Sequence, residues 1–314
     1  MSRQLINRSP DLRRLRDDGF KIEVRGSHLL VHDVPYLNAT RELKYGVLVS
    51  DLTLAGDVTT TPGTHVAFFV GEHPCNKDGS EMTKIKHQST DTSLSRDLVV
   101  NHSFSSKPRS GYRDYYEKMR TYFNMISSPA RSAHPKVTET VPLVVESRDE
   151  QSVFQYVDTA SSRSKITAVT QKLDIGPIAI VGLGGTGSDV LDLLAKTPVQ
   201  AIHLYDGDEY LQHNAFRSPG APSLDELREK HTKVEYLKAM YSNMHRHIHA
   251  HPEFIDDSNV NELREMAFVF VCLDKGEPRR LIIANLQGAG VPFIDVGMGI
   301  ELVDDRLLGV LRIT

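Results

Sequence analysis

Two patterns of hydrophobic and polar residues divide the chain near residues 145–175. In the first half, short alternating runs are separated by turn clusters such as Asp57–Gly63 and Asn76–Ser80, which is typical of strands. The predicted strands are Phe20–Val24, Leu29–Val34, Gly46–Leu54, His65–Val70 and Leu98–Phe104. Helical spacing predicts helices over Pro10–Asp18 and Tyr112–Ile126. The first half therefore predicts an α+β domain.

In the second half, short apolar runs alternate with helical segments. The predicted buried strands are Ile178–Val181, Ala201–Tyr205, Phe268–Cys272 and Val291–Ile294, and the predicted helices are Val190–Ala195, Lys233–Met244 and Arg279–Ala289. This alternation is typical of a doubly wound, Rossmann-like α/β domain, which binds its ligand beyond the carboxyl ends of the strands. We expect an N-terminal α+β domain at residues 1–150, a linker at 151–170 and the α/β domain at 171–314.

A glycine-rich turn follows the first strand of the α/β domain. Residues 182–187 read Gly-Leu-Gly-Gly-Thr-Gly, a G-x-G-x-x-G pattern, and helical spacing continues from Ser188. Glycines let the backbone approach a phosphate without a Cβ in the way, and the following helix points its N–H groups at the anion. The pattern alone fits NAD, FAD or ATP, and it also fits a tight strand–helix turn that binds nothing.

Polar residues after the next strands distinguish between these nucleotides. Asp206 ends the second strand, where a carboxylate can accept hydrogen bonds from ribose hydroxyls. Arg217 and Lys233 follow, and such cations can offset the charge of β- and γ-phosphates. Each of the two could equally be a solvent-exposed surface residue. Asp274 ends the third strand, where a carboxylate can hold Mg²⁺ or cap a helix. Two cations that follow the proposed ribose-binding Asp206 in the sequence favour a triphosphate over a hydride-transfer cofactor.

Five short motifs occur in order between residues 163 and 314: GLGGTG, D-x-D, N-x-x-R, K-V-E and C-x-D. This order resembles the ThiF/MoeB superfamily of adenylyltransferases, which includes the ubiquitin-activating enzymes. The resemblance implies an enzyme that uses ATP and Mg²⁺ to adenylate the C-terminal carboxylate of a ubiquitin-like protein and releases pyrophosphate. It also implies a symmetric homodimer. An NAD(P)-dependent oxidoreductase and a non-catalytic nucleotide-binding scaffold are the alternatives.

The resemblance also implies a role for each motif residue. The implied nucleotide-binding residues are Gly182, Gly184, Gly185 and Gly187 at the α-phosphate, Asp206 at the ribose, Asp208 near the nucleotide and Asn214 at the phosphates. The implied catalytic residues are Arg217 and Lys233 at the phosphates, Asp274 at Mg²⁺, and Arg163, which the dimer partner would donate. No protein nucleophile is implied, because the substrate carboxylate attacks the α-phosphorus, and positioning and charge stabilisation supply the rate.

Composition limits the other function classes. The 314-residue chain has 37 Lys and Arg against 41 Asp and Glu, so no basic excess predicts nucleic-acid binding. The only cysteines are Cys75 and Cys272, which fits a reducing cytoplasm and excludes both a disulfide framework and the four-cysteine zinc site of many relatives. No apolar run of about 18 residues predicts a membrane span. Because relatives continue further, we expect a chain that is incomplete beyond Thr314.

One stretch of the N-terminal half resembles ubiquitin-conjugating enzymes. Two strands, Gly46–Leu54 and His65–Phe69, lead through prolines to His73–Asn76, which reads His-Pro-Cys-Asn where that family has His-Pro-Asn. Met82 stands near the position of the family's thiol. The resemblance implies a module that presents the modifier or a target, and a conjugating-enzyme-like protein as a further partner. Cys75 is either a relocated acceptor thiol or a structural turn residue, and we favour the structural role.

Three further groups of residues allow both a structural and a functional interpretation. We favour a buried thiol at Cys272, a solvated strand edge rather than a metal site at His245, His247, His249 and His251, and a core stripe rather than a binding surface at Tyr112, Tyr115, Tyr116, Tyr122 and Phe123.

Overall fold

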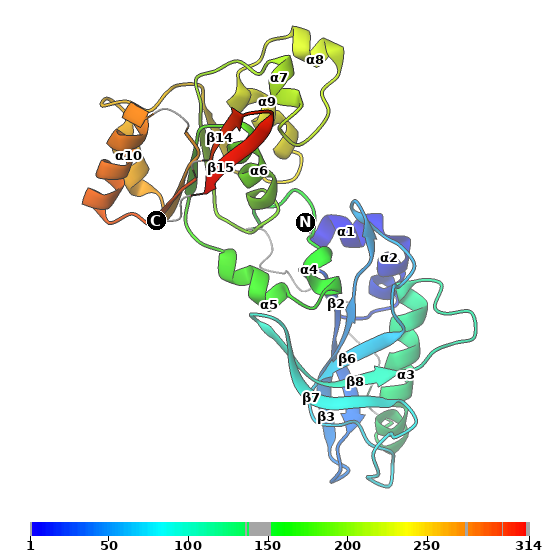
Figure 1. The fold of residues 1–314 in the computed structure, drawn as a ribbon. Coiled ribbons are helices and arrows are strands. Elements are labelled where there is room, and N and C mark those ends of the chain that lie inside the picture. Colours follow the sequence, from blue (N-terminus) through cyan, green and yellow to red (C-terminus); the bar gives the residue numbers. More distant parts are fainter. Residues whose placement is uncertain (1, 136, 138–151, 274–275, 297, 312–314) are drawn as a thin grey trace. The chain divides into compact units, whose positions relative to one another are not determined.

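In the computed structural model, the described residues are 2–135, 137, 152–273, 276–296 and 298–311. Contacts divide the chain into two compact units, Met1–Ser152 with Tyr156–Gln171 and Val153–Gln155 with Lys172–Thr314. We call these the first unit and the second unit. Figure 1 shows an antiparallel sheet with a long helix in the first unit and a sheet flanked by helices in the second. Among the described residues, no helix has both the length and the apolar character that crossing a membrane requires.

The first unit contains a six-stranded antiparallel sheet in the order β1-β2-β3-β6-β8-β7. Its strands are β1 (Ile22–Arg25), β2 (His28–Leu37), β3 (Leu43–Asp51), β6 (Val66–Val70), β7 (Lys86–Ser95) and β8 (Leu98–Ser105). Its helices are α1 (Ser2–Arg8), α2 (Pro10–Asp17), α3 (Tyr115–Ala133), α4 (Ala160–Arg163) and α5 (Thr167–Thr170). A separate small hairpin pairs β4 (Leu54–Ala55) with β5 (Val58–Thr59). This arrangement confirms the predicted α+β class.

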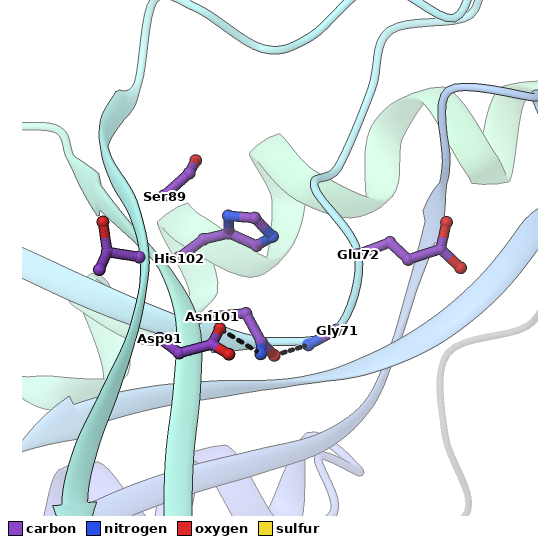
Figure 2. Close-up of a pocket in the computed structure, with 7 residues that line it drawn as sticks. Gly71, Glu72, Ser89, Asp91, Asn101 and His102 are labelled. Carbon is purple, nitrogen blue, oxygen red and sulfur yellow. Dashed lines mark hydrogen bonds between the residues drawn. The ribbon is translucent and has the colours of Figure 1, made fainter.

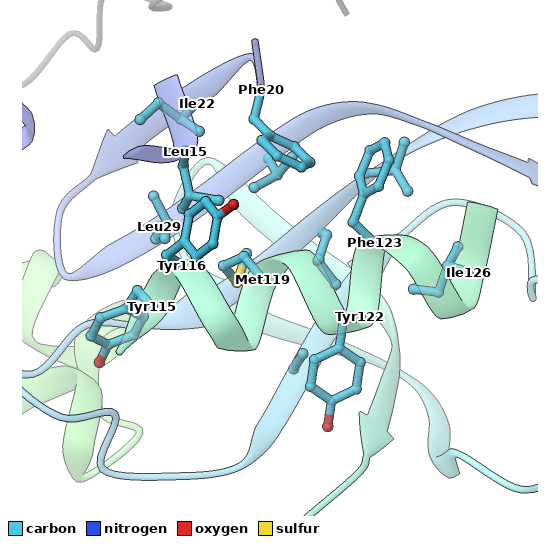
Figure 3. Packing of buried hydrophobic residues seen from close by; sticks show 14 of the residues in the cluster. Leu15, Phe20, Ile22, Leu29, Tyr115, Tyr116, Met119, Tyr122, Phe123 and Ile126 are labelled. Atoms are coloured by element: carbon cyan, nitrogen blue, oxygen red, sulfur yellow. The ribbon is translucent and has the colours of Figure 1, made fainter. Parts of the chain in front are cut away.

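The long helix α3 supplies much of the core of the first unit (Figure 3). Its buried stripe comprises Tyr115, Met119, Tyr122, Phe123 and Ile126, each at most 1% exposed. The ring of Phe123 meets Phe20 edge-on, with centroids 4.9 Å apart. Full burial of such side chains stabilises a fold by about 1.5–3 kcal/mol each. The predicted core stripe is therefore confirmed, and these aromatic residues do not form a binding surface.

Lys118 is the charged exception in this core. The residue is fully buried on α3, and its Nζ donates hydrogen bonds to Ser50 Oγ at 2.8 Å and to the Thr64 carbonyl oxygen at 2.9 Å. Burial lowers the pKa of Lys118 to about 8, and the charge of Asp51 opposes that shift only in part. The folded first unit thus holds this proton less tightly than the unfolded chain does.

The second unit is built on a five-stranded parallel sheet in the order β11-β10-β9-β12-β13. Its strands are β9 (Ile178–Val181), β10 (Ile202–Tyr205), β11 (Ile248–His251), β12 (Phe268–Val271) and β13 (Phe293–Asp295), and a separate hairpin pairs β14 (Met298–Val303) with β15 (Arg306–Leu311). Its helices are α6 (Gly185–Leu194), α7 (Gln212–Ala215), α8 (Leu224–Arg228), α9 (Lys233–Tyr241) and α10 (Gly276–Ala289), with a 3-10 helix, η3, at Val260–Glu265. The strand order confirms the predicted doubly wound fold.

Helices cover both faces of the parallel sheet. Leu191 of α6 and Leu237 of α9 pack in one cluster, and Leu263 of η3 packs with Ile282 and Leu286 of α10 in the other. Coverage on both sides explains why the inner strands β9 and β12 are continuous apolar runs, whereas β11 at the edge alternates apolar residues with histidines.

The structure departs from the predicted elements mainly at their ends and in polar segments. The strand predicted from Phe20 begins at Ile22, because Gly19 has a φ of 89° and the Phe20 N–H donates back to Leu15. The strand predicted to reach Leu54 ends at Asp51, which pairs with His28, because its partner β2 begins there, directly after the tight turn at Gly26. No apolar alternation marks β7, whose first eight residues are exposed.

We expect the stability of the first unit to increase between about pH 8 and pH 10.4. The unfolded lysine has a pKa near 10.4, so within this window the unfolded chain binds more protons and the free energy of unfolding rises, by up to about 3 kcal/mol for Lys118. The measurement is denaturant unfolding of wild type and Lys118→Met across this range. Their difference in unfolding free energy isolates Lys118, because tyrosines with raised pKa values, such as Tyr115, affect both proteins equally. A difference that does not change with pH would contradict the prediction.

Candidate functional site

The site begins at the glycine turn between β9 and α6. Gly182 has a φ of +91°, and a Cβ there would lie 2.8 Å from the Cys272 carbonyl oxygen. A Cβ at Gly187 would lie 1.9 Å from the Gly182 carbonyl oxygen. These two glycines therefore allow the turn to pack against the end of β12 and the first turn of α6 to pack against the end of β9.

The middle glycines have different surroundings. A Cβ at Gly184 would meet nothing within 4 Å among the described residues, and this residue caps α6 without a side-chain hydrogen bond. A Cβ at Gly185 would lie 3.1 Å from the Arg217 carbonyl oxygen. The ten-residue helix α6 thus begins at an open position. Its first N–H groups have no partner within the helix, and such a helix start can bind an anion.

Asp206 connects this turn to the end of β10. Its side chain is 6% exposed, and one carboxylate oxygen accepts the Leu183 N–H at 2.7 Å while the other accepts the Asp208 N–H at 2.9 Å. The predicted ribose acid therefore lies at the carboxyl end of β10, next to the glycine turn.

Lys233, at the start of α9, lies between two carboxylates. Its Nζ is 3.3 Å from both oxygens of Asp206 and 2.6 Å from Asp208 Oδ2. The side chain of Lys233 is 8% exposed, whereas that of Asp208 is 55% exposed. The three formal charges sum to −1, so the two carboxylates more than offset the positive charge of the lysine. The structure brings these predicted residues together, with Lys233 facing acids.

Asn214 and Arg217 are positioned by the short helix α7. Asn214 is 2% exposed, its Oδ1 accepts the Leu211 N–H at 2.9 Å, and its Nδ2 has no partner among the described residues. The backbone N–H of Arg217 donates to the Asn214 carbonyl oxygen at 3.0 Å. The exposed Arg217 side chain runs past Gly185, with its Cδ 3.8 Å from the position of a Cβ there. No ion pair links Arg217 to any described residue. The exposed cation of Arg217 therefore lies beside the open turn, and a buried unpaired donor, Asn214 Nδ2, stands three residues earlier on α7.

Two predicted residues cannot be assigned to the site. Arg163 is exposed at the end of α4 and belongs to the first unit. Asp274 lies outside the described residues. Arg163 at the nucleotide and Asp274 at Mg²⁺ thus stay predictions.

An ion pair that the sequence analysis missed lies at the carboxyl end of β13. Arg279 of α10 contacts Asp295, with its Nε 2.7 Å from one carboxylate oxygen and its terminal nitrogen 2.7 Å from the other. The signal was present, because Asp295 directly follows an apolar strand run, as Asp206 does. The described part of the chain thus has a second acid at this edge of the sheet, already paired with a cation.

Neither cysteine has an activated thiol. Burial, and to a lesser degree the charge of Asp295, raises the pKa of Cys272 to about 12. Cys75 is 1% exposed, and its Sγ donates to the His73 carbonyl oxygen at 3.3 Å. Burial and nearby carboxylates raise the pKa of Cys75 as well. Both thiols therefore fit the structural roles that we favour.

The alternating histidines lie at the β11 edge of the parallel sheet. His245 is buried before the strand, and its Nε2 is 2.9 Å from the Val199 carbonyl oxygen. His249 and His251 stack with His203 of the neighbouring strand. Burial lowers the pKa of His203 to about 4, with contributions from the two neighbouring imidazoles. Within the described residues, no group of three or more His, Cys, Asp or Glu side chains is arranged to hold a metal ion.

The first unit has a polar cavity of its own, about 470 Å³ in volume (Figure 2). Its lining is Gly71, Glu72, Ser89, Thr90, Asp91, Asn101 and His102. Asn101 organises one wall, because its Oδ1 accepts the Gly71 N–H at 2.9 Å and its Nδ2 donates to Asp91 at 3.0 Å. The sequence analysis missed this cavity, since its residues come from three separated segments without a shared motif.

Comparison with known proteins finds a family match for each half of the chain. Residues 157–301 match the ThiF family, and residues 10–159 match the Domain of unknown function (DUF6791). No curated protein is significantly similar to the chain in sequence.

Two solved structures from E. coli are similar to part of the chain. The tRNA N6-threonylcarbamoyladenosine dehydratase TcdA is 22% identical, with 45% of this chain and 61% of TcdA covered and a TM-score of 0.38. MccB, solved with ATP, is 23% identical, with 41% of this chain and 39% of MccB covered and a TM-score of 0.37. The chain therefore spans less than two thirds of either protein.

The glycine geometry predicts different costs in stability for two alanine substitutions. Gly187→Ala should destabilise the second unit by about 1–3 kcal/mol or more, because the new methyl group would overlap the Gly182 carbonyl. Gly184→Ala should cost about 1 kcal/mol or less, because the position is open. Thermal unfolding of the two variants beside wild type measures the difference. Equal destabilisation would show that the turn does not pack as described.

Proposed function

From the match of residues 157–301 to the ThiF family, we propose that the protein is an ATP-dependent adenylyltransferase that activates the C-terminal carboxylate of a ubiquitin-like modifier. A carboxylate oxygen attacks the α-phosphorus of ATP and forms an acyl–phosphate bond. The bond between the α-phosphorus and the bridging oxygen breaks, and its electron pair leaves with pyrophosphate. The products are an acyl-adenylate and pyrophosphate, so no oxidant, reductant or protein nucleophile is needed.

The observation that supports ATP best is the arrangement around Gly185. The open start of α6 and the exposed Arg217 side chain lie together at this point, and Asn214, whose Nδ2 has no partner among the described residues, stands three residues before Arg217. A phosphate chain would accept hydrogen bonds from the helix N–H groups and the amide, and Arg217 would offset its charge. An oxidoreductase would leave Arg217 without a role.

Each described residue would contribute binding or positioning rather than covalent chemistry. Asp206 would accept hydrogen bonds from the ribose and hold the turn through Leu183. Arg217 would stabilise charge that develops on the leaving pyrophosphate, and Lys233 would supply a second cation from α9.

Mg²⁺ is the cofactor that such a reaction would use. Among the described carboxylates near the carboxyl edge of the sheet, Asp206 and Asp208 share the ammonium group of Lys233 and Asp295 contacts Arg279, so each of these three already contacts a cation. We therefore propose that Asp274, together with phosphate oxygens, would hold the ion, since Mg²⁺ is usually bound through one or two carboxylates and phosphates. The ion would shield phosphate charge.

We expect the protein to bind MgATP and not NAD⁺ or NADP⁺. The reason is the position of Arg217, beside the first turn of α6 where a triphosphate would extend. Isothermal titration of the full chain with each nucleotide provides the test. Binding of NAD⁺ without binding of ATP would overturn the assignment in favour of an oxidoreductase, and binding of ATP without any turnover would favour a scaffold.

Removing one charge should impair adenylation strongly. In ATP–pyrophosphate exchange with a cognate ubiquitin-like protein, Arg217→Ala and Lys233→Ala should each lose about 2–4 kcal/mol of transition-state stabilisation, and Asp274→Ala should abolish exchange. Arg228→Ala is the matched control, because this exposed arginine pairs with the exposed Asp225 of its own helix. Wild-type exchange in folded Arg217→Ala would show that the phosphates lie elsewhere.

We also propose a symmetric dimer in which Arg163 reaches the site of the partner subunit. If so, mixing inactive Arg163→Ala and Asp274→Ala proteins should restore exchange, because one of the two sites in a mixed dimer would contain both intact residues. Light scattering reports the oligomeric state of the same samples. A fully active monomer at micromolar concentration would contradict this proposal.

A further inference from the structure

The side chain of Phe254 packs against Gly207, the residue that follows Asp206 at the end of β10. Phe254 is 55% exposed. A Cβ at Gly207 would lie 2.7, 2.8 and 3.0 Å from three atoms of the Phe254 ring. The ring therefore packs on the backbone of Gly207, and a larger residue at position 207 would displace it.

The loop that holds Phe254 is fixed by its own hydrogen bonds. The Glu253 N–H donates to the His251 carbonyl oxygen at 2.8 Å, and Asn259 Nδ2 donates to the Phe254 carbonyl oxygen at 3.0 Å. The Asp256 N–H in turn donates to Asn259 Oδ1 at 2.9 Å. An exposed apolar side chain needs no special explanation by itself. The loop backbone is fixed by these hydrogen bonds and the ring packs on Gly207, so the ring can offer a flat face to a ligand at little cost in conformational entropy.

The order of the strands places this ring where a base would lie. The glycine turn follows β9, Asp206 follows β10, and Phe254 lies in the loop that follows β11. Neighbouring strands are about 4.8 Å apart, so the three features succeed one another along the carboxyl edge of the sheet. Phosphate, ribose and base succeed one another in the same order along a nucleotide.

We propose that Phe254 is the platform on which the base of the bound nucleotide stacks, and this inference rests on the proposed function. The phenyl ring has no hydrogen-bonding group, so it recognises the aromatic face of the base and not its edge. Gly207 has the complementary role of leaving room for the ring. Phe254 thus contributes to affinity for a nucleoside triphosphate and contributes nothing to affinity for its phosphate chain alone.

Two ligands separate these contributions. Titration of Phe254→Ala with ATP should give a dissociation constant about 5- to 150-fold above that of wild type, the range for loss of one base–aromatic stack. Titration with inorganic tripolyphosphate should give the wild-type constant, and Phe254→Tyr should restore ATP affinity. An unchanged ATP affinity in Phe254→Ala would overturn the inference, as would an equal loss for tripolyphosphate.

The absence of tryptophan from the chain allows a direct optical test. Phe254→Trp creates a single tryptophan at the proposed platform, and its fluorescence should be quenched by ATP and not by tripolyphosphate. Leu193→Trp is the control, because Leu193 is 68% exposed near the far end of α6, about 12 Å along the helix from the turn. Equal responses at the two positions would refute stacking at Phe254.

These experiments also distinguish the inference from the function on which it rests. Wild type that does not bind ATP at all would overturn the proposed function. Wild type that binds ATP, together with a Phe254→Ala variant that binds it equally well, would overturn only the role of Phe254.

Discussion

The carboxylate of Asp206 joins three segments that are separated in the sequence. It accepts the Leu183 N–H of the glycine turn and the Asp208 N–H beyond β10, and it contacts the ammonium group of Lys233 on α9. A carboxylate that is 6% exposed would be costly without such partners, because desolvation costs several kcal/mol per ion. The turn, the end of β10 and the start of α9 are thereby held in one geometry, which fixes the glycines, Asp208 and Lys233 relative to one another.

Of the four glycines of the turn, two are required by close packing and two leave space at the start of α6. Gly182 and Gly187 leave space that neighbouring backbone carbonyls fill, so their absence of a Cβ is explained by the fold. Gly184 is open, and Gly185 meets only Arg217. The fold explains Gly182 and Gly187, whereas Gly184, at the start of α6, leaves space among the described residues that a ligand could occupy. The G-x-G-x-x-G pattern is therefore a composite of structural and functional requirements.

The sequence predicted best what depends on periodicity. Strand β9 occupies the predicted residues, and the stripe of α3 from Tyr115 to Ile126 is buried as its spacing indicated. It predicted poorly the ends of strands that depend on a partner distant in sequence, as at Asp51, where β3 ends because its partner β2 begins at His28. For the site, the structure brings Asp206, Lys233 and the glycine turn together, and their roles at a nucleotide stay predictions. Spacing could not show that Lys233 would lie between two acids, because side-chain contacts follow from how α9 packs on the sheet.

This difference in surroundings separates the two candidate cations physically. Lys233 is buried against Asp206 and Asp208, so removing it would leave carboxylates without their cation and would weaken the fold as well as the site. Arg217 is exposed and has no ion pair with a described residue, so removing it would leave no buried charge uncompensated. A loss of activity on removing Arg217 therefore reports on phosphate binding directly. A loss on removing Lys233 can be attributed to chemistry only after its cost in folding free energy has been measured. The exposed cation beside Gly185, rather than the buried one, is thus the more informative test of where the phosphates lie.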